Sequence, residues 1–246
     1  AAFAMLGATA YCIFAGSEVA TERSLIMILV MLGAVLVDRP VLSMRNLAVA
    51  ALIVMAREPE SVMGPSFQMS FAAVAGMVAL FERGPEDEAG NRAHDFFHRA
   101  IRAFGVMMLT TCVAGLATGP FASFHFHRIN PYSMIGNAMT LPLVEFIVMP
   151  AAILGVVLEP LGLDAPIWWM MGLGISGMMD MSRYVAALPG STRYVEAFGL
   201  NALLCFSLGL LWLCLWRSQI RYLGVVFLGL GLFLAAQDRP PDLVID

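Results

Sequence analysis

The sequence predicts an all-α, polytopic membrane protein with short and broken helices, some of which could be re-entrant. Of the 246 residues, 60% are hydrophobic and only 13% are charged, whereas soluble domains carry about 25% charged residues. The mean hydropathy is +0.81. Apolar runs of helical length recur along the chain, and the period-two alternation of an outer-membrane barrel is absent.

The predicted apolar segments follow one another along nearly the whole chain. They cover approximately residues 1–16, 24–37, 44–56, 66–82, 101–118, 132–158, 166–187, 196–216 and 220–236. Segments such as 25–37 and 44–56 are shorter than the roughly 20 residues that cross a bilayer. These short segments suit helices shielded by their neighbours, or half-membrane hairpins, better than independent spans.

Two polar stretches interrupt this pattern. Residues 83–100 are predicted to form a solvated loop between two helices, with an amphipathic entry to the second one. Residues 238–246 are predicted to begin a linker to a further domain. We therefore interpret residues 1–246 as one transmembrane domain, clipped at both ends from a longer protein.

Residues 64–71 carry polar groups from a turn into an apolar segment. Gly64 and Pro65 are expected to end the preceding helix, because both residue types interrupt regular helices. Gln68 and Ser70 then enter a segment that otherwise predicts membrane burial. Lipid cannot hydrogen-bond these side chains, so we expect them to face protein or a watery substrate path.

Residues 118–150 are the most unusual stretch for a membrane protein. Thr118-Gly119-Pro120 is predicted to break one helix. The next apolar run is interrupted at Asn137, Thr140, Pro142, Glu145 and Pro150. Broken helices at membrane depth are tolerated only where they are buried in protein or line a cavity. We therefore expect a substrate path in this region.

Ionisable residues inside apolar runs are costly and are usually partnered or functional. Glu145 could carry a proton or guard the path, and it could equally be hydrogen-bonded to a neighbouring helix. Asp180 and Arg183 stand three residues apart on one helical face. They are predicted to pair with each other.

Aromatic and basic side chains are concentrated between residues 124 and 128. Phe124, Phe126, His127 and Arg128 combine rings that can stack on bases with groups that can hold phosphates. The same residue types also anchor helices at the membrane interface, which is the commoner explanation of such a cluster. The sequence leaves both roles open.

A metal site and an enzyme activity are not predicted. His125 and His127 could open a zinc-hydrolase signature, but the Asp and His expected after them are replaced by Ile129 and Asn130. No Cys, Asp or Glu lies nearby in the sequence to complete three or four ligands. We therefore predict no metal, no cofactor and no catalytic residue.

Small residues in the apolar runs are expected to serve packing. The four cysteines, Cys12, Cys112, Cys205 and Cys214, have no metal-like spacing and are predicted to be small core residues. Glycines at helical spacing let membrane helices approach closely. We expect this role for the glycines in residues 172–177 and for Gly224, Gly229 and Gly231.

Short motifs stand in a specific order over nearly the whole chain. They are Tyr11, Gly16, Glu22-Arg23, Asp38-Arg39, Pro59 and residues 67–71, followed by Pro120, Phe126, Asn137, Pro142, Pro150 and residues 187–190. This order resembles the competence domain of the ComEC family of DNA-uptake channels. Ser24 departs from the alanine expected after the Glu-Arg pair.

The resemblance implies a multi-pass protein of the bacterial inner membrane that passes one DNA strand into the cytoplasm during natural transformation. Its implied partners are single-stranded DNA, the lipid bilayer and other DNA-uptake proteins, and homo-oligomers are left open. Members of the family often carry an OB-like domain before this region and a metallo-β-lactamase-like domain after it. The substrate path is expected at Gln68, Ser70, Phe124, Phe126, His127, Arg128, Asn137 and Glu145.

A transporter of small molecules or lipid-linked substrates is the main alternative. Such a protein would have the same composition and the same broken helices. Many transporters are built from internal repeats that place equivalent broken helices in both halves. No convincing repeat relates residues 1–120 to residues 121–246.

Overall fold

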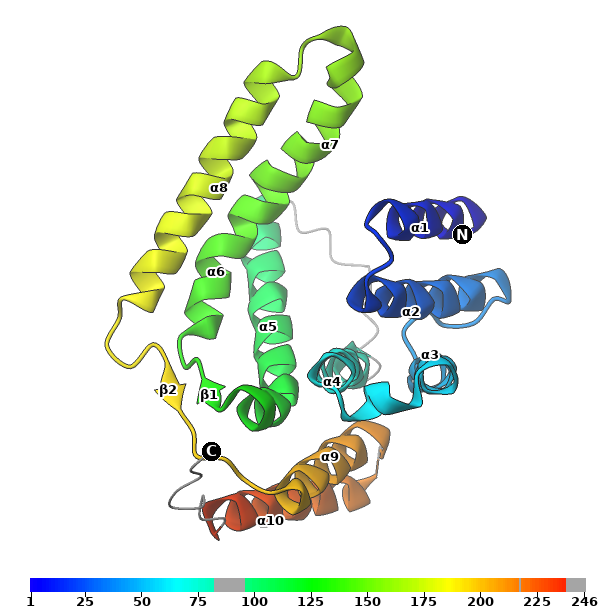
Figure 1. Cartoon of the computed structure of the whole chain (residues 1–246), viewed down its shortest axis with the longest axis vertical. Helices are drawn as coiled ribbons and strands as arrows, with labels where there is room; N and C mark the ends of the chain where they lie inside the picture. Colours follow the sequence, from blue (N-terminus) through cyan, green and yellow to red (C-terminus); the bar gives the residue numbers. More distant parts are fainter. Residues whose placement is uncertain (82–95, 217, 238–246) are drawn as a thin grey trace, which may run out of the picture. The chain divides into compact units, whose positions relative to one another are not determined.

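The computed structural model describes residues 1–81, 96–216 and 218–237, which are helical apart from two short strands and the connecting turns (Figure 1). This confirms the predicted fold class. The α-helices are α1 (Ala2–Phe14), α2 (Val19–Leu36), α3 (Met44–Arg57), α4 (Pro65–Phe81), α5 (Phe96–Phe126), α6 (Ser133–Leu143), α7 (Met149–Leu158), α8 (Ala165–Ala186), α9 (Leu200–Leu215) and α10 (Leu223–Gln237). Shorter elements are η1 (Pro59–Met63), the π-helical turn η2 (Val144–Val148), η3 (Glu159–Leu161), η4 (Gln219–Tyr222) and the strands β1 (Arg128–Ile129) and β2 (Arg193–Tyr194).

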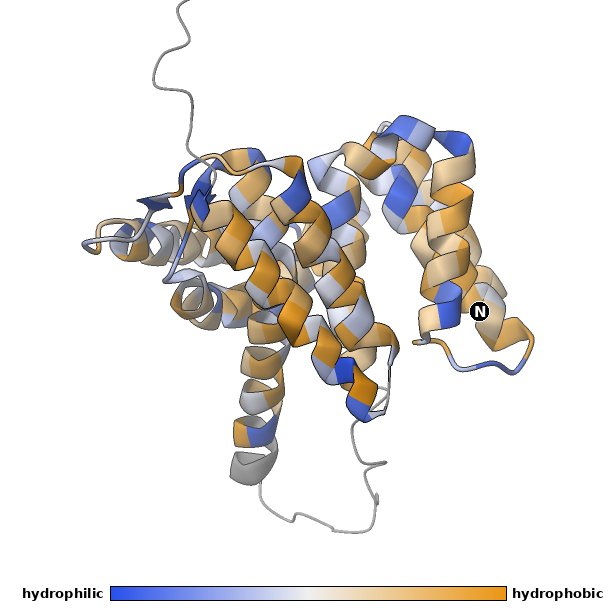
Figure 2. Cartoon of the chain, turned by 90° about the horizontal axis from the view of Figure 1, so that it is seen from below, coloured by the Kyte–Doolittle hydropathy of each residue, from blue (hydrophilic) through white to orange (hydrophobic). Residues whose placement is uncertain are grey.

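Four helical stretches in the described part of the chain are long and apolar enough to cross a membrane. They are Val19–Leu36, Ile101–Phe126, Ser133–Leu161 and Gln219–Gln237. α1, α4 and α9 are apolar but shorter, which confirms the expectation of short helices among the longer ones. Figure 2 shows that hydrophobic residues make up much of the helices.

The predicted polar loop ends earlier than expected. Residues 96–100 belong to the first turns of α5, because polar residues can end a membrane span without ending the helix that carries it. Residues 83–95 of that loop and the predicted linker at 238–246 lie outside the described residues. The helix break predicted at Gly64 and Pro65 is confirmed, since η1 ends before Gly64 and α4 begins at Pro65.

Two other predicted helix breaks are wrong. α5 continues through Thr118-Gly119-Pro120 to Phe126, because a proline removes one backbone hydrogen bond and membrane helices tolerate that loss. The run after Ser133 is distorted and not interrupted. α6 passes into α7 through η2, and Pro142 and Pro150 flank this wider turn. A π-helical turn absorbs a shift in hydrogen-bond register inside a helix.

The chain forms two compact units, of which the first contains α1 to α4, residues 116–126 of α5, α9 and α10. One buried cluster joins Met27 of α2, Ala50 of α3 and Phe71 of α4 to Cys214 of α9. A second cluster joins the end of α5 to α9, and it consists of Ala72, Ala117, Phe121, Phe198, Ala202, Leu203 and Phe206. Cys12 and Cys214 are buried, as predicted for small core residues.

α9 and α10 pack against each other backbone to backbone in the first unit (Figure 1). A Cβ atom added to Gly224 would lie 2.7 Å from the carbonyl oxygen of Gly209, and one added to Gly231 would lie 3.0 Å from the ring of Phe206. This confirms the packing role predicted for Gly224 and Gly231. The prediction is wrong for Gly229 within the described residues, since none of their atoms lies within 4 Å of such a Cβ. Gly224 and Gly231 are two helical turns apart on one face, and Gly229 lies on another.

The second unit contains residues 96–115 of α5 and the chain from β1 to β2. α8 lies alongside the helix formed by α6, η2 and α7 (Figure 1). Glycines allow this approach, since a Cβ atom on Gly174 would lie 2.9 Å from Cγ2 of Ile147, and one on Gly155 would lie 2.8 Å from the ring of Trp168. β1 and β2 pair in antiparallel orientation. Arg183 and Asp180 form the predicted ion pair, at 3.4 Å.

Candidate functional site

Polar side chains gather in the first unit where four helices begin or end. α2 and α4 begin here, and α3 and α5 end here, with η1 between α3 and α4. We call this group the polar layer, and it consists of Glu22, Arg23, Arg57, Glu58, Ser61, Ser66, Gln68 and His125. Because these residues come from separate elements, only the folded chain brings them together.

Arg23 is a buried cation at the centre of the polar layer. It lies in the first turns of α2 and is only 5% exposed. Its Nη2 donates a hydrogen bond to Oγ of Ser66, at the start of α4. A cavity of about 20 Å³ lies beside it, and Glu22, Glu58 and Ser61 line this cavity. A charge removed from water needs such partners, because an unpaired buried ion is very costly.

Two buried polar atoms of the residues that line this cavity lack a hydrogen-bond partner within the described part of the chain. Nε of Arg23 and Oγ of Ser61 are buried and have no hydrogen-bond partner among the residues that the structure describes. Most buried polar groups in proteins are paired. The side of the layer between α2 and η1 therefore has hydrogen-bonding capacity that its own described residues do not use.

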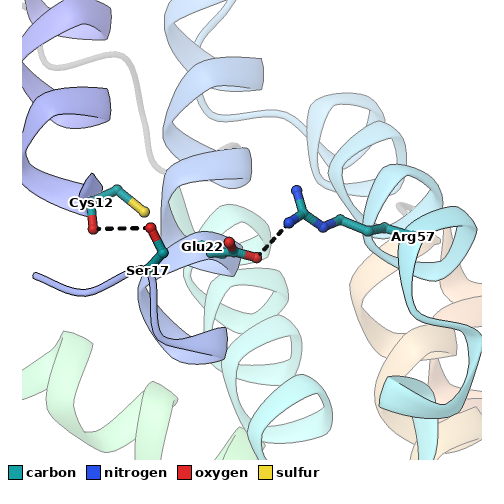
Figure 3. Close-up of polar contacts among 4 residues, drawn as sticks. All are labelled: Cys12, Ser17, Glu22 and Arg57. Atoms are coloured by element: carbon teal, nitrogen blue, oxygen red, sulfur yellow. Dashed lines mark hydrogen bonds and ion pairs between the residues drawn. The ribbon is translucent and has the colours of Figure 1, made fainter.

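Glu22 and Arg57 connect the start of α2 to the end of α3. Their carboxylate Oε2 and guanidinium Nη2 are 2.9 Å apart (Figure 3). Figure 3 also shows the turn before α2, in which Oγ of Ser17 donates to the carbonyl oxygen of Cys12. The Glu22 and Arg57 side chains are 26% and 60% exposed. An ion pair this exposed contributes little to the stability of the fold. Because Arg57 is largely exposed, its charge can be reached by solvent or by a ligand.

Gln68 joins α4 to both η1 and α5. Its amide Nε2 donates to the carbonyl oxygen of Val62 at 3.0 Å, and its Oε1 lies 2.9 Å from Nε2 of His125. Since the amide nitrogen is directed to Val62, the oxygen must accept, and Nε2 of His125 carries the hydrogen. The expectation that Gln68 faces protein is confirmed. Ser70 is half-buried two residues further along α4.

The Gln68 and His125 side chains are expected to stabilise the first unit as a pair. Gln68→Leu and His125→Phe each leave the other partner unsatisfied, at a cost of about 1 kcal/mol. The double variant removes both polar groups, so its loss of melting temperature should be smaller than the sum of the two single losses. Thermal unfolding of the purified protein measures this coupling. Strictly additive losses would contradict it.

Of the other predicted site residues near the end of α5, one is packed in the first unit, and the others are exposed or belong to the second unit. Phe124 contacts the ring of His125 at a centroid distance of 5.1 Å and that of Phe198 at 5.6 Å. Phe126 and His127 are exposed at the end of α5, where His127 has a φ of +53°. Arg128 lies on β1 of the second unit. Gln68 and Phe124 are thus brought together through His125.

Asn137 and Glu145 lie on the surface of the second unit. Asn137 is exposed on α6, and Glu145 is exposed within the π-helical turn η2. Within the described part of the chain no hydrogen bond of Glu145 is found, which disfavours the alternative that its carboxyl group is bonded to a neighbouring helix. π-helical turns are often found at functional sites, and the role of Glu145 in a path stays a prediction.

The two strands form a second polar feature that sequence reasoning missed in part. We call it the basic ribbon, and it consists of Arg128, Ile129, Arg193 and Tyr194. Arg128 stands opposite Tyr194, and Ile129 stands opposite Arg193. Only Arg128 was predicted as a site residue, because a pairing across 65 intervening positions has no signal in a single sequence. Within the described residues, no group of three or more His, Cys, Asp or Glu side chains is placed to hold a metal.

Comparisons with known proteins agree with the order of the motifs. A family model described as Competence protein matches residues 1–220. The chain is similar to the ComE operon protein 3 of Bacillus subtilis (strain 168), with 22% identity over 148 residues. That match covers 60% of this chain but only 17% of the Bacillus protein. No solved structure matches the chain.

Proposed function

The chain belongs to the Competence protein family, and on that premise we propose that it passes single-stranded DNA across the inner membrane of a bacterium during DNA uptake. We propose further that it crosses this membrane several times and acts with other competence proteins. The similarity to the ComE operon protein 3 of Bacillus subtilis (strain 168) supports this direction. This chain matches only part of that protein, so the proposal concerns the parent protein of this domain.

The polar layer is the observation that carries the proposal. A helical unit with apolar surfaces brings an amide, an imidazole, hydroxyl groups and two guanidinium groups to one end. Ionisable groups within membrane segments are costly, and they commonly mark substrate pathways. Three of the family-like motifs, Glu22-Arg23, Pro59 and residues 67–71, supply or adjoin this layer.

The charges of the layer suit a polyanion. Arg23 and Arg57 offset Glu22 and Glu58, so the layer has no net negative charge although the whole chain has a formal charge of −4. The polar layer therefore does not repel phosphates in the way that a ring of carboxylates would.

We propose that this domain moves the strand without changing it covalently. Each carboxylate of the polar layer lies near an arginine, as in the contact between Glu22 and Arg57. The ion pair with Arg57 accounts for Glu22 without a catalytic role. Transport with no resident cofactor is the activity that these groups support best.

Entry of labelled linear DNA into a nuclease-protected cytoplasmic state tests the proposed function. Cells with the intact parent gene are compared with cells that lack it, and DNA binding at the cell surface is measured in both. We expect the deletion to abolish entry and to leave surface binding intact. Unchanged entry would contradict the proposal and favour a transporter of small molecules or lipid-linked substrates.

A further inference from the structure

The basic ribbon lies between two segments that can cross the membrane. β1 follows the candidate span Ile101–Phe126, and the candidate span Ser133–Leu161 begins shortly after it. A two-stranded ribbon also has an unpaired edge on each strand, and lipid cannot satisfy the backbone groups of such edges. The exposed ribbon must therefore lie in contact with water, at the membrane surface or along a water-filled cavity.

One face of the ribbon presents a cation beside an aromatic ring. Residues directly opposite each other in an antiparallel pair project to the same face, with Cβ atoms about 5 Å apart. Arg128 and Tyr194 are such a pair. Tyr194 is 87% exposed, so its ring is not packed on the protein and can accept a stacked partner. Arg128 is exposed as well.

The ribbon and its flanking loops have a positive charge although the chain as a whole is acidic. Residues 127–132 and 187–199 contain two arginines and one histidine against one carboxylate, that of Glu196. The hydroxyl of Tyr132 donates to the carbonyl oxygen of Pro189 at 3.3 Å, which ties one loop to the other. The positive face is thus held in place by a contact outside the strands.

We infer that the basic ribbon binds single-stranded DNA, with Arg128 on a phosphate and Tyr194 stacked on a base. The identity of the ligand rests on the proposed function. The chemistry rests on the ribbon itself, because single strands are held by basic groups that follow the phosphates and by aromatic rings that stack on the bases. An interfacial anchor needs a ring that embeds among lipid headgroups, and it does not need an arginine paired across the strands with that ring.

Binding of a labelled oligothymidylate to the full-length protein in phosphatidylcholine nanodiscs tests this inference. Tyr194→Leu removes the aromatic ring but keeps apolar bulk, and it should weaken binding about tenfold. Tyr194→Phe should bind as the wild type does. Arg128→Gln should reduce the slope of log affinity against log salt by about 0.7, the value for one lost phosphate contact.

Tyr184 and Arg183 provide matched controls, because both are exposed on α8 and lie outside the ribbon. Tyr184→Leu and Arg183→Gln should leave both affinity and salt slope unchanged. The inference is overturned if the wild type does not bind the probe, or if the ribbon variants bind normally. It is also overturned if the ribbon variants fail only in entering nanodiscs, which would identify an interfacial anchor.

The two proposals fail in different ways. If DNA entry depends on the parent gene but the ribbon variants bind normally, the ribbon inference is wrong and the transport function stands. If the ribbon binds the probe as described but entry does not depend on the gene, the transport function is wrong. The ribbon would then remain a binding site for single-stranded DNA in a protein whose function is not DNA transport.

Discussion

Replacing Arg23 with leucine is expected to lower DNA entry roughly 10- to 100-fold, the factor that corresponds to losing one hydrogen bond to a charged group. Arg23 is 5% exposed and donates to Ser66, so it links α2 to α4 within the polar layer. Its loss would leave Glu58 and Glu22 around the cavity with one cation fewer. A passing polyanion would then meet net negative charge. Entry of labelled DNA, normalised to membrane abundance of the protein, measures the effect.

Arg39 offers the matched control for this substitution. It follows α2 at the end of the helix away from the polar layer, and it is exposed. Arg39→Leu removes the same charge from the chain but should leave DNA entry within about twofold of the wild type, since an exposed cation outside the layer contributes little locally. Equal losses in the two variants would show that the net charge of the protein matters and that the polar layer does not.

Replacing Gly224 with alanine is expected to destabilise the hairpin of α9 and α10. The added Cβ atom would lie 2.7 Å from the carbonyl oxygen of Gly209 and 3.1 Å from the backbone nitrogen of Leu213. Backbone atoms cannot rotate away as a side chain can, so the helices must separate. Overpacking of this kind costs about 1–3 kcal/mol. A lower melting temperature and lower abundance of the purified protein should report it.

Gly229 allows the same change at a position without a close neighbour. It stands on α10, and no atom of the part of the chain that the structure describes lies within 4 Å of an added Cβ. Gly229→Ala should leave stability unchanged or raise it by up to about 1 kcal/mol, because alanine favours a helix over glycine. A loss of stability at Gly229 as large as that at Gly224 would mean that helix contact does not explain the requirement for glycine.

Helices could be predicted well from the sequence because each depends mainly on local apolar runs. The predicted segment 44–56 became α3, and 66–82 became α4. Prolines led to the main errors. A proline usually ends or kinks a helix in water, but Pro120 is accommodated inside α5. No water competes for the backbone hydrogen bonds of a helix within the membrane. Pro142 and Pro150 shifted the hydrogen-bond register and left the helix continuous.

The candidate site could be predicted only where polarity was locally out of place. Gln68 stood out because an amide in an apolar run needs a partner, but nothing local identified that partner as His125, 57 residues away. Arg193 and Tyr194 gave no signal, because each is ordinary in a polar loop. Only the strand register, which places Tyr194 opposite Arg128, identifies them as candidate site residues.

Photocross-linking of the incoming DNA strand tests whether DNA passes the polar layer. A photoreactive amino acid replaces Ser70, which is half-buried and one turn beyond Ser66 on the same face of α4. The control position is Leu52, which is 63% exposed on the apolar surface of α3. Both proteins must still take up DNA.

The two positions are compared during uptake of labelled DNA in cells. We expect cross-links between the strand and the protein from position 70 and none from position 52. Cross-linking from position 52 alone, or equally from both positions, would contradict passage at the polar layer.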